Sequence, residues 1–280
     1  MILADTARQV PGFVPNLAPG PRLEISGILP DLYDGFNGAS SLVLTNQHDT
    51  RPPSEFTYLE LAERAARWAN VFEGLGLAPG ETVFTLLGRV PEQHLAALGA
   101  WRARAVYAPL YAAYGPEPVR ERLHRGHGRA LVTTLARYRR KVAPIRDQLP
   151  GLTHVLLVGT PDGDPPPGTA WFEELVDAAP AEAEIPATDP EAPAVLHFTS
   201  GTTGTPKLIV HTGAGLTAHA RAVHEHLEVD RIRDRWLACL PLAHIGGLGV
   251  VLRSILDDVA VDVLPSFDAE AVMAASKTAG

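Results

Sequence analysis

One stretch of the chain combines the residue types that bind polyphosphate: His197-Phe-Thr-Ser-Gly-Thr-Thr-Gly-Thr-Pro-Lys207. Its glycines let the backbone approach an anion and turn N–H groups toward it. Its hydroxyl side chains are further donors, and Lys207 supplies a mobile positive charge. An ordinary Gly/Thr turn between two strands is the alternative. We predict a phosphate-binding loop made of Thr199, Ser200, Gly201, Thr202, Thr203, Gly204, Thr205 and Lys207.

Two better-known phosphate-binding patterns do not describe this loop. The Walker A pattern places four residues between its first glycine and a Gly-Lys pair, which Ser or Thr follows. Here Lys207 follows Pro206 and precedes Leu208. The Gly-x-Gly-x-x-Gly dinucleotide pattern is also absent from this segment. A generic P-loop NTPase is therefore a poor fit.

The segments around the loop predict alternating strands and helices. Thr57 and Glu60 form a candidate capping box, and apolar residues then recur at helical spacing. Trp68 and Trp101 fall on such apolar faces, which predicts that both lie in the core. Strands are expected at 82–87, 106–110, 130–133, 154–158, 194–198, 208–211, 235–240 and 259–264, and later helices at about 137–149, 214–227, 247–256 and 268–276.

Near-continuous apolar strands separated by helices are typical of mainly parallel sheets that helices cover on both faces. We therefore predict an α/β fold of layered, mainly parallel sheets flanked by helices. Residues 1–50 are rich in Pro and Gly and predict an irregular N-terminal arm. Residues 51–190 are expected to form a first α/β subdomain. Residues 191–280 are expected to hold the phosphate loop and an incomplete second subdomain.

Composition excludes several classes of protein. The apolar fraction of 46% over 280 residues is that of a globular protein with a sizeable core. A net charge of −8 argues against a nucleic-acid partner. The single cysteine, Cys239, excludes a disulfide within the chain and predicts a small buried hydrophobe. No run is long and apolar enough for a membrane span, and no signal peptide is evident, so we expect no membrane partner and a cytoplasmic location.

No metal-binding set of side chains is predicted. His224 and His226 are two positions apart on an expected helix and point to different sides of it. The basic run Arg137-Tyr-Arg-Arg-Lys141 is expected to be a solvated helix face, with contact to an anionic ligand as the alternative.

A second candidate site is the segment Pro241-Leu-Ala-His-Ile-Gly-Gly-Leu-Gly249. It follows an expected strand and precedes an expected helix. Ligands bind at such strand ends in open α/β sheets.

The phosphate loop resembles the signature of the adenylate-forming superfamily, the AMP-dependent synthetases and ligases, over Thr199–Lys207. Four other segments are similar to acetyl-CoA synthetases and related acyl-CoA ligases: Phe56-Thr-Tyr-Leu-Glu-Leu61, Leu86-Leu-Gly-Arg-Val-Pro91, Tyr107-Ala-Pro-Leu-Tyr111 and Gly115-Pro-Glu-Pro118. The resemblance implies the N-terminal portion of an acyl-CoA-synthetase-like large domain. It also implies ATP, Mg²⁺ and CoA as ligands, and a carboxylic acid as substrate.

The second segment resembles the motif in which an acyl- or aryl-CoA ligase places a histidine beside the acyl pocket. That implies that His244 donates a hydrogen bond to the substrate carboxylate, with Gly246 and Gly247 leaving room for the acyl chain. The alternative is that His244 only caps the next helix and the glycines serve close packing. His244 and Lys207 are thus the candidate catalytic residues. Small residues here favour an acid larger than acetate, aromatic or medium-chain.

The chain departs from the family in two respects. Leu208 stands where a glycine usually follows the lysine. The sequence also lacks the later part of the family's large domain, with its magnesium- and ribose-binding acids, and the small C-terminal domain with its lysine.

The leading hypothesis is an AMP-forming acid–CoA ligase that is catalytically incomplete alone. Alternatives are a non-catalytic nucleotide- or acyl-binding remnant, or one half of a split enzyme completed by a C-terminal polypeptide. If the second sheet is cut short, its exposed apolar edge could also be covered by self-association into a homo-oligomer.

Overall fold

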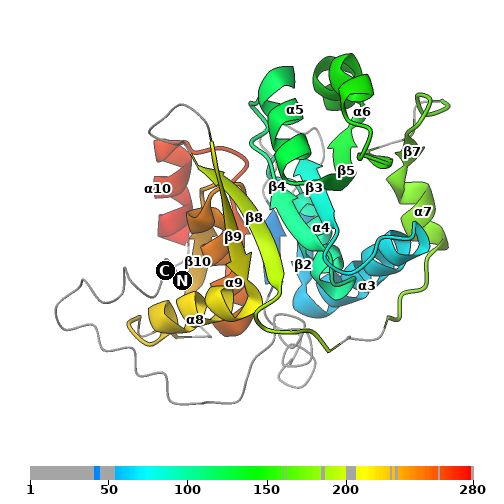
Figure 1. Cartoon of the computed structure of the whole chain (residues 1–280). Coiled ribbons are helices and arrows are strands. Elements are labelled where there is room, and N and C mark those ends of the chain that lie inside the picture. Colours follow the sequence, from blue (N-terminus) through cyan, green and yellow to red (C-terminus); the bar gives the residue numbers. More distant parts are fainter. Residues whose placement is uncertain are drawn as a thin grey trace.

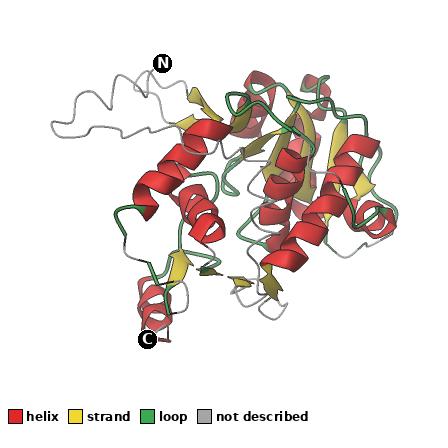
Figure 2. Ribbon diagram, turned by 90° about the horizontal axis from the view of Figure 1, so that it is seen from below, coloured by secondary structure: helices red, strands yellow, loops and turns green. Residues whose placement is uncertain are grey.

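The protein contains two β-sheets, as seen in a computed structural model that describes residues 41–44, 54–159, 161, 163–183, 187–199, 206–227, 229–230, 233–257 and 259–278. The larger sheet has the strand order β7-β6-β5-β3-β4-β8-β9, and the smaller has the order β10-β11-β1-β2. Helices flank the strands of both sheets (Figures 1 and 2). The α/β fold predicted from the sequence is confirmed.

The larger sheet is parallel except at its end, where β9 runs antiparallel to β8. Side chains of β3 and β4 are buried along their whole length because helices cover both faces. The strands are β3 (Thr82–Leu86), β4 (Val106–Pro109), β5 (Gly128–Thr134), β6 (His154–Val158), β7 (Ala170–Trp171), β8 (Pro193–Thr199) and β9 (Lys207–Thr212).

Two hydrophobic clusters lie on opposite faces of this sheet. Val83 of β3 belongs to the cluster beneath α3 and α4, whereas its neighbour Phe84 belongs to the cluster beneath α5 and the turns that follow β5. This alternation is what a strand covered on both faces requires. The helical elements are α3 (Tyr58–Gly74), α4 (Pro91–Arg102), α5 (Pro116–Arg125), α6 (Leu135–Arg137), a π-helical turn η1 (Tyr138–Val142), a 3-10 turn η2 (Ala143–Gln148) and α7 (Phe172–Ala178).

Local signals in the sequence correctly fixed where α3 begins. The Thr57 hydroxyl accepts a hydrogen bond from the Glu60 amide (3.1 Å), and the Glu60 carboxylate accepts one from the Thr57 amide (2.7 Å). This is the predicted capping box. The single helix expected over 137–149 is instead broken into three short helical pieces, with Pro144 in the first turn of the last one.

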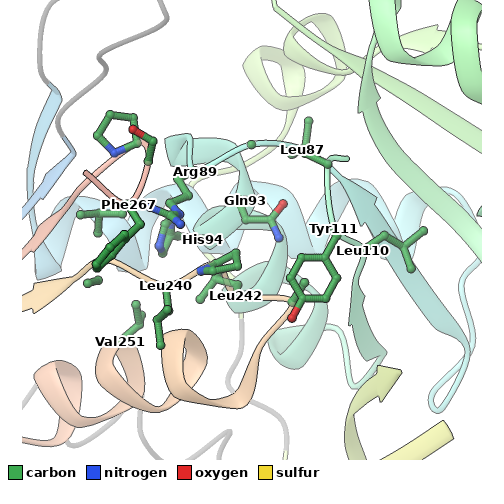
Figure 3. A pocket seen from close by; sticks show the side chains of 18 residues that line it. Leu87, Arg89, Gln93, His94, Leu110, Tyr111, Leu240, Leu242, Val251 and Phe267 are labelled. Atoms are coloured by element: carbon green, nitrogen blue, oxygen red, sulfur yellow. The ribbon is translucent and has the colours of Figure 1, made fainter. Parts of the chain in front are cut away.

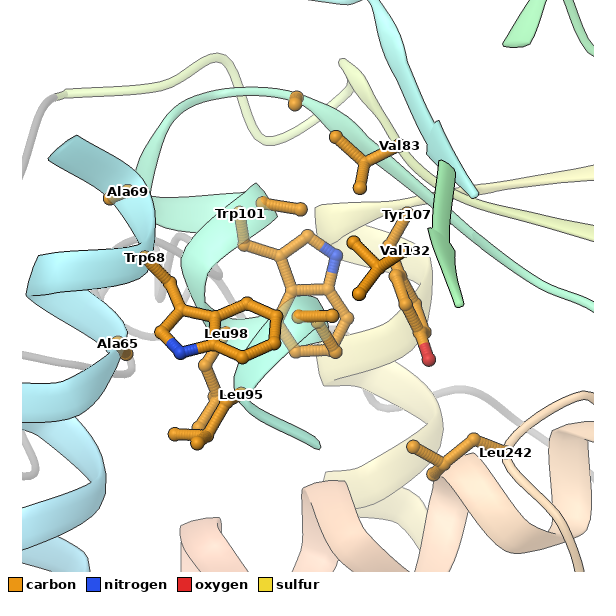
Figure 4. Close-up of a cluster of buried hydrophobic side chains, with 14 of the residues drawn as sticks. Ala65, Trp68, Ala69, Val83, Leu95, Leu98, Trp101, Tyr107, Val132 and Leu242 are labelled. Atoms are coloured by element: carbon orange, nitrogen blue, oxygen red, sulfur yellow. The ribbon is translucent and has the colours of Figure 1, made fainter. Parts of the chain in front are cut away.

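Aromatic side chains join the helices to the large sheet (Figure 4). Trp68 and Trp101 are both buried, as predicted. The Trp101 indole donates a hydrogen bond to the Ala194 carbonyl at 2.9 Å, which ties α4 to β8. At Gly99 a Cβ would lie 2.5 Å from the Trp68 Cβ, so the glycine permits the close approach of α4 to α3.

The smaller sheet combines strands from both ends of the chain. β1 (Ser41–Leu44) runs parallel to β11 (Ala260–Val263) and antiparallel to β2 (Ser54–Thr57), and β10 (Arg235–Ala238) pairs with β11. The prediction of an entirely irregular arm over 1–50 was therefore wrong at β1, since pairing with distant strands orders it. The pairing also runs across the division expected near residue 190. Helices α8 (Gly213–His224), α9 (Ile245–Asp257) and α10 (Ala269–Thr278) accompany this part of the chain.

Candidate functional site

The phosphate loop connects the two strands of an antiparallel hairpin. β8 leads into the loop and β9 leads out of it, and Thr199 and Lys207 are cross-strand partners at its base. In Figure 1 this hairpin runs through the middle of the molecule, between the two groups of helices. Lys207 is exposed and forms no ion pair with any described residue. The remaining predicted loop residues lie outside the described residues: Ser200, Gly201, Thr202, Thr203, Gly204 and Thr205.

The end of the loop is attached to the body of the protein. Arg125, the last residue of α5, donates a hydrogen bond from its guanidinium to the Pro206 carbonyl. Lys207 is the next residue, so this hydrogen bond holds the backbone beside it while its side chain remains exposed to solvent. Lys207 lies opposite Thr199 across the hairpin, and an ammonium with a hydroxyl group is a donor set that suits phosphate oxygens.

His244 lies at the start of α9, as the sequence predicted from its position between a strand and a helix. Its side chain is exposed, and its Nδ1 accepts a hydrogen bond from the Gly246 amide at 3.0 Å. The His244 carbonyl accepts from the amides of Gly247 (3.0 Å) and Leu248 (3.2 Å). The side chain thus satisfies one of the free N–H groups at the start of the helix. Its Nε2 has no described hydrogen-bond partner.

The glycines after His244 serve close packing at one position at least. A Cβ at Gly247 would lie 2.3 Å from the Pro241 carbonyl oxygen and 2.5 Å from the Leu240 carbonyl oxygen. No side chain fits there, so the packing of the backbone requires glycine at position 247. At Gly246 a Cβ would lie 3.0 Å from the Leu240 Cδ1 and 3.1 Å from the His244 Nδ1.

A buried histidine that the sequence did not identify connects these two motifs. His197 of β8 is only 4% exposed. Its Nε2 lies 2.9 Å from the Leu242 carbonyl oxygen, two residues before His244, and its Nδ1 lies 3.2 Å from His211 Nε2 on β9. Burial lowers the pKa of His197 to about 4, with smaller effects from His211 and His244. The sequence signal for this contact is a polar residue inside an apolar strand.

A cavity of about 270 Å³ opens where the strand ends of both sheets meet (Figure 3). Its walls come from the segments after β3 and β4, from Leu240–Ala243, and from Pro265–Phe267. Most of this lining is apolar, and its polar groups include Arg89, Gln93, His94 and Tyr111. Two of the segments quoted for the family resemblance contribute to it, although the sequence did not predict a cavity there.

The polar groups of this cavity are held by the fold. Arg89 Nη1 donates to the Leu264 carbonyl at 3.0 Å, and Gln93 Nε2 donates to the Tyr107 hydroxyl at 2.7 Å. Burial lowers the pKa of His94 to about 4, so this imidazole is neutral at pH 7. Burial also lowers the pKa of the Arg89 guanidinium. A fixed set of donors in an apolar pocket is typical of small-molecule sites.

Two basic side chains, those of Arg137 and Lys141, lie at one edge of the cavity. Lys141 donates to the carbonyl of Ala112, a lining residue, and Arg137 Nη2 is 3.6 Å from where a Gly88 Cβ would stand. Burial lowers the pKa of both groups, as do neighbouring arginines. Two of the basic residues of the run 137–141 therefore face the cavity edge rather than forming only a solvated face.

Within the described parts of the chain, no group of three or more His, Cys, Asp or Glu side chains could hold a metal ion. None of the helices in these parts of the chain is long and apolar enough to cross a membrane. Cys239 is a free thiol of intermediate burial.

Comparison with known proteins identifies relatives of this fold and these motifs. The family model described as AMP-binding enzyme matches residues 42–278. An acetyl-coenzyme A synthetase of Bdellovibrio bacteriovorus is 28% identical over 220 residues, which are 74% of this chain and 34% of the relative. The acetyl-coenzyme A synthetase of Bacillus subtilis is 32% identical over 166 residues, 58% of this chain and 28% of the relative.

Solved structures share the fold. An acyl-CoA synthetase of Brucella canis aligns with a TM-score of 0.79 at 23% identity, covering 99% of this chain and 48% of that protein. ATP-bound MatB of Rhodopseudomonas palustris aligns with a TM-score of 0.74 at 22% identity, covering 89% and 47%. The chain thus spans about a third of the curated relatives and about half of the solved structures. Because the family model matches most of its length, this chain belongs to the AMP-binding enzyme family, whose members similar to it include acetyl-CoA synthetases and acyl-CoA ligases.

Proposed function

We propose that this chain forms part of an AMP-forming acid–CoA ligase. In the first reaction a carboxylate oxygen attacks the α-phosphorus of ATP, pyrophosphate leaves, and an acyl-adenylate forms. In the second the thiol of CoA attacks the acyl carbon, loses its proton, and AMP leaves. The observation that carries the proposal is the contact between the phosphate-loop hairpin and the His244 segment, which His197 joins through Leu242. This contact joins the strand that leads into the candidate phosphate loop to the segment before the candidate acid-binding residue His244.

ATP is assigned to the loop at Thr199–Lys207. Lys207 and the hydroxyl groups would hold the β- and γ-phosphates, where negative charge accumulates as pyrophosphate departs. Positioning and charge stabilisation are the main contributions that a protein makes to such a step. Mg²⁺ bound to the phosphates would neutralise further charge. No cluster of metal ligands within the described residues competes for that ion.

The acid and the thiol are assigned to the region between His244 and the cavity. His244 is exposed at the start of α9, so its free Nε2 could donate to a substrate carboxylate. A cavity of about 270 Å³ with mainly apolar walls has space for an acid larger than acetate. Arg137 and Lys141 at its edge are suited to the phosphates of CoA. A carrier-protein thiol is the alternative acceptor.

Whether this chain alone can catalyse both reactions is a separate question. Because the chain spans about half of the solved structures, its own activity requires a test. A non-catalytic remnant would bind ATP and never turn it over. One half of a split enzyme would become active when a polypeptide with the rest of the fold is added. We propose the cytoplasm as its location. The division at residues 50 and 190 also remains a proposal, and strand pairings such as β1 with β11 and β4 with β8 cross it.

The experiment is acid-dependent exchange of labelled pyrophosphate into ATP, with acetate, medium-chain and aromatic acids. Exchange stimulated by one acid supports adenylation and identifies the substrate. Lys207→Ala should abolish this exchange, whereas Arg139→Ala, a change in an exposed side chain of η1, should not. Exchange that Lys207→Ala leaves intact would contradict the proposed role of the loop.

A further inference from the structure

His197 joins β8 to the segment that carries His244 through a side-chain hydrogen bond. The Leu242 carbonyl accepts its only described side-chain hydrogen bond from His197 Nε2, at 2.9 Å. The two residues are 45 positions apart in the sequence, so this contact joins β8 directly to the segment between β10 and α9. A buried carbonyl needs such a donor, because burial without one costs free energy.

The hydrogen-bond partners of His197 determine its tautomer. Because a carbonyl oxygen only accepts, His197 Nε2 must carry the proton. The neutral ring then has a bare Nδ1, which can only accept, and His211 Nε2 must donate to it at 3.2 Å. Donation therefore runs in one direction, from His211 on β9 to His197 on β8 and on to Leu242. Burial keeps the His197 ring neutral at pH 7.

These contacts bracket the phosphate loop. His197 precedes Thr199 by two residues, His211 follows Lys207 by four, and the cross-strand pairs of β8 and β9 connect them. We propose that His197 is a positioning residue that couples the phosphate-loop hairpin to the His244 segment, so that nucleotide bound at the loop also stiffens the start of α9. The positioning of Leu242 by His197 is inferred from the contacts alone. The coupling to bound nucleotide rests on the proposed function.

Two substitutions separate hydrogen bonding from packing. His197→Gln keeps one donor and one acceptor on a planar group, so it can still donate to the Leu242 carbonyl and accept from His211. His197→Leu fills a similar volume and removes both bonds. Val195→Ala is the matched control, because it weakens the same strand at a buried position whose side chain makes no hydrogen bond.

The test is amide hydrogen exchange on the purified chain. The probes are the amides of His244, Gly247 and Leu248, which are hydrogen-bonded at the start of α9. Relative to amides of β5, their exchange should be about tenfold faster in His197→Leu, close to wild type in His197→Gln, and unchanged in Val195→Ala. Equal exchange in wild type and His197→Leu, or equal acceleration in both His197 variants, would overturn the positioning role.

Addition of ATP and Mg²⁺ tests the coupling. In wild type the nucleotide should slow exchange of the same three amides. In His197→Leu it should still bind but leave them unchanged. Binding without any slowing in wild type would overturn the coupling. Absence of ATP binding to wild type would contradict the proposed function instead, while the comparison without nucleotide still decides the positioning role.

A second variant serves if His197→Leu fails to fold. His211→Leu removes only the donor to His197 Nδ1 and should accelerate exchange of the same amides about threefold. No acceleration would contradict the proposal.

Discussion

Acid should destabilise this protein through two buried histidines, His94 and His197. Burial lowers the pKa of each to about 4, from 6.5 for an ordinary histidine. Between those two pH values the unfolded chain binds more protons at these sites than the folded chain does. Their contribution to the free energy of unfolding is therefore fully present above about pH 6.5 and is lost as the pH falls toward about 4.

The size of the effect follows from the difference between the folded and unfolded pKa values. At about pH 5 each unfolded site is almost fully protonated and each folded site is largely neutral, so each site costs about 2 kcal/mol relative to pH 7.5. Toward pH 4 and below the loss per site approaches about 3 kcal/mol. These are large fractions of the stability of an ordinary domain.

The assay is urea unfolding of wild type and His197→Gln, followed by tryptophan fluorescence at about pH 7.5 and about pH 5. Carboxylates that titrate in the same range affect both proteins equally, so they cancel in the comparison. The variant should lose about 2 kcal/mol less than wild type between the two pH values. Parallel losses in both proteins would show that His197 is not held neutral by burial, and would refute this reasoning.

Three further predictions follow from packing and capping, each read from urea unfolding at neutral pH. Gly247→Ala should cost at least about 2 kcal/mol, because its Cβ would overlap the backbone carbonyls of residues 240 and 241, whereas the control Gly249→Ala, which meets only an ordinary contact, should cost less than about 1 kcal/mol. Thr57→Ala should cost about 1 kcal/mol through loss of the cap of α3, and no loss would contradict the capping box. Trp101→Phe should cost about 1 to 3 kcal/mol, because it leaves the buried Ala194 carbonyl without its donor; an unchanged midpoint would show that this bond contributes nothing.

Local signals in the sequence predicted the elements well. The capping box at Thr57 and the apolar runs at β3, β4 and β6 each depend on residues close together in the chain. The two strands predicted on either side of the candidate phosphate loop are present as β8 and β9 for the same reason. Helical periodicity also placed Trp68 and Trp101 in the core.

Features that depend on distant residues were not predicted. β1 pairs with residues 261–263 as well as with β2, and it lies in a segment, 1–50, whose Pro- and Gly-rich composition predicted an irregular arm. His197 acquires its partners from β9 and from the segment after β10, neither of which adjoins it in sequence. The requirement for glycine at 247 likewise comes from the path of the backbone at Pro241. No local pattern contains these three facts.

The central claim is that the loop ending at Lys207 binds the β- and γ-phosphates of a nucleotide. Calorimetric titration of wild type and Lys207→Ala with ATP and with AMP, in the presence of Mg²⁺, tests it most directly. Loss of one charge-assisted contact should weaken ATP binding about tenfold or more. AMP lacks the β- and γ-phosphates, so its affinity should change less than about twofold. Equal weakening of both nucleotides, or no weakening of ATP, would contradict the account.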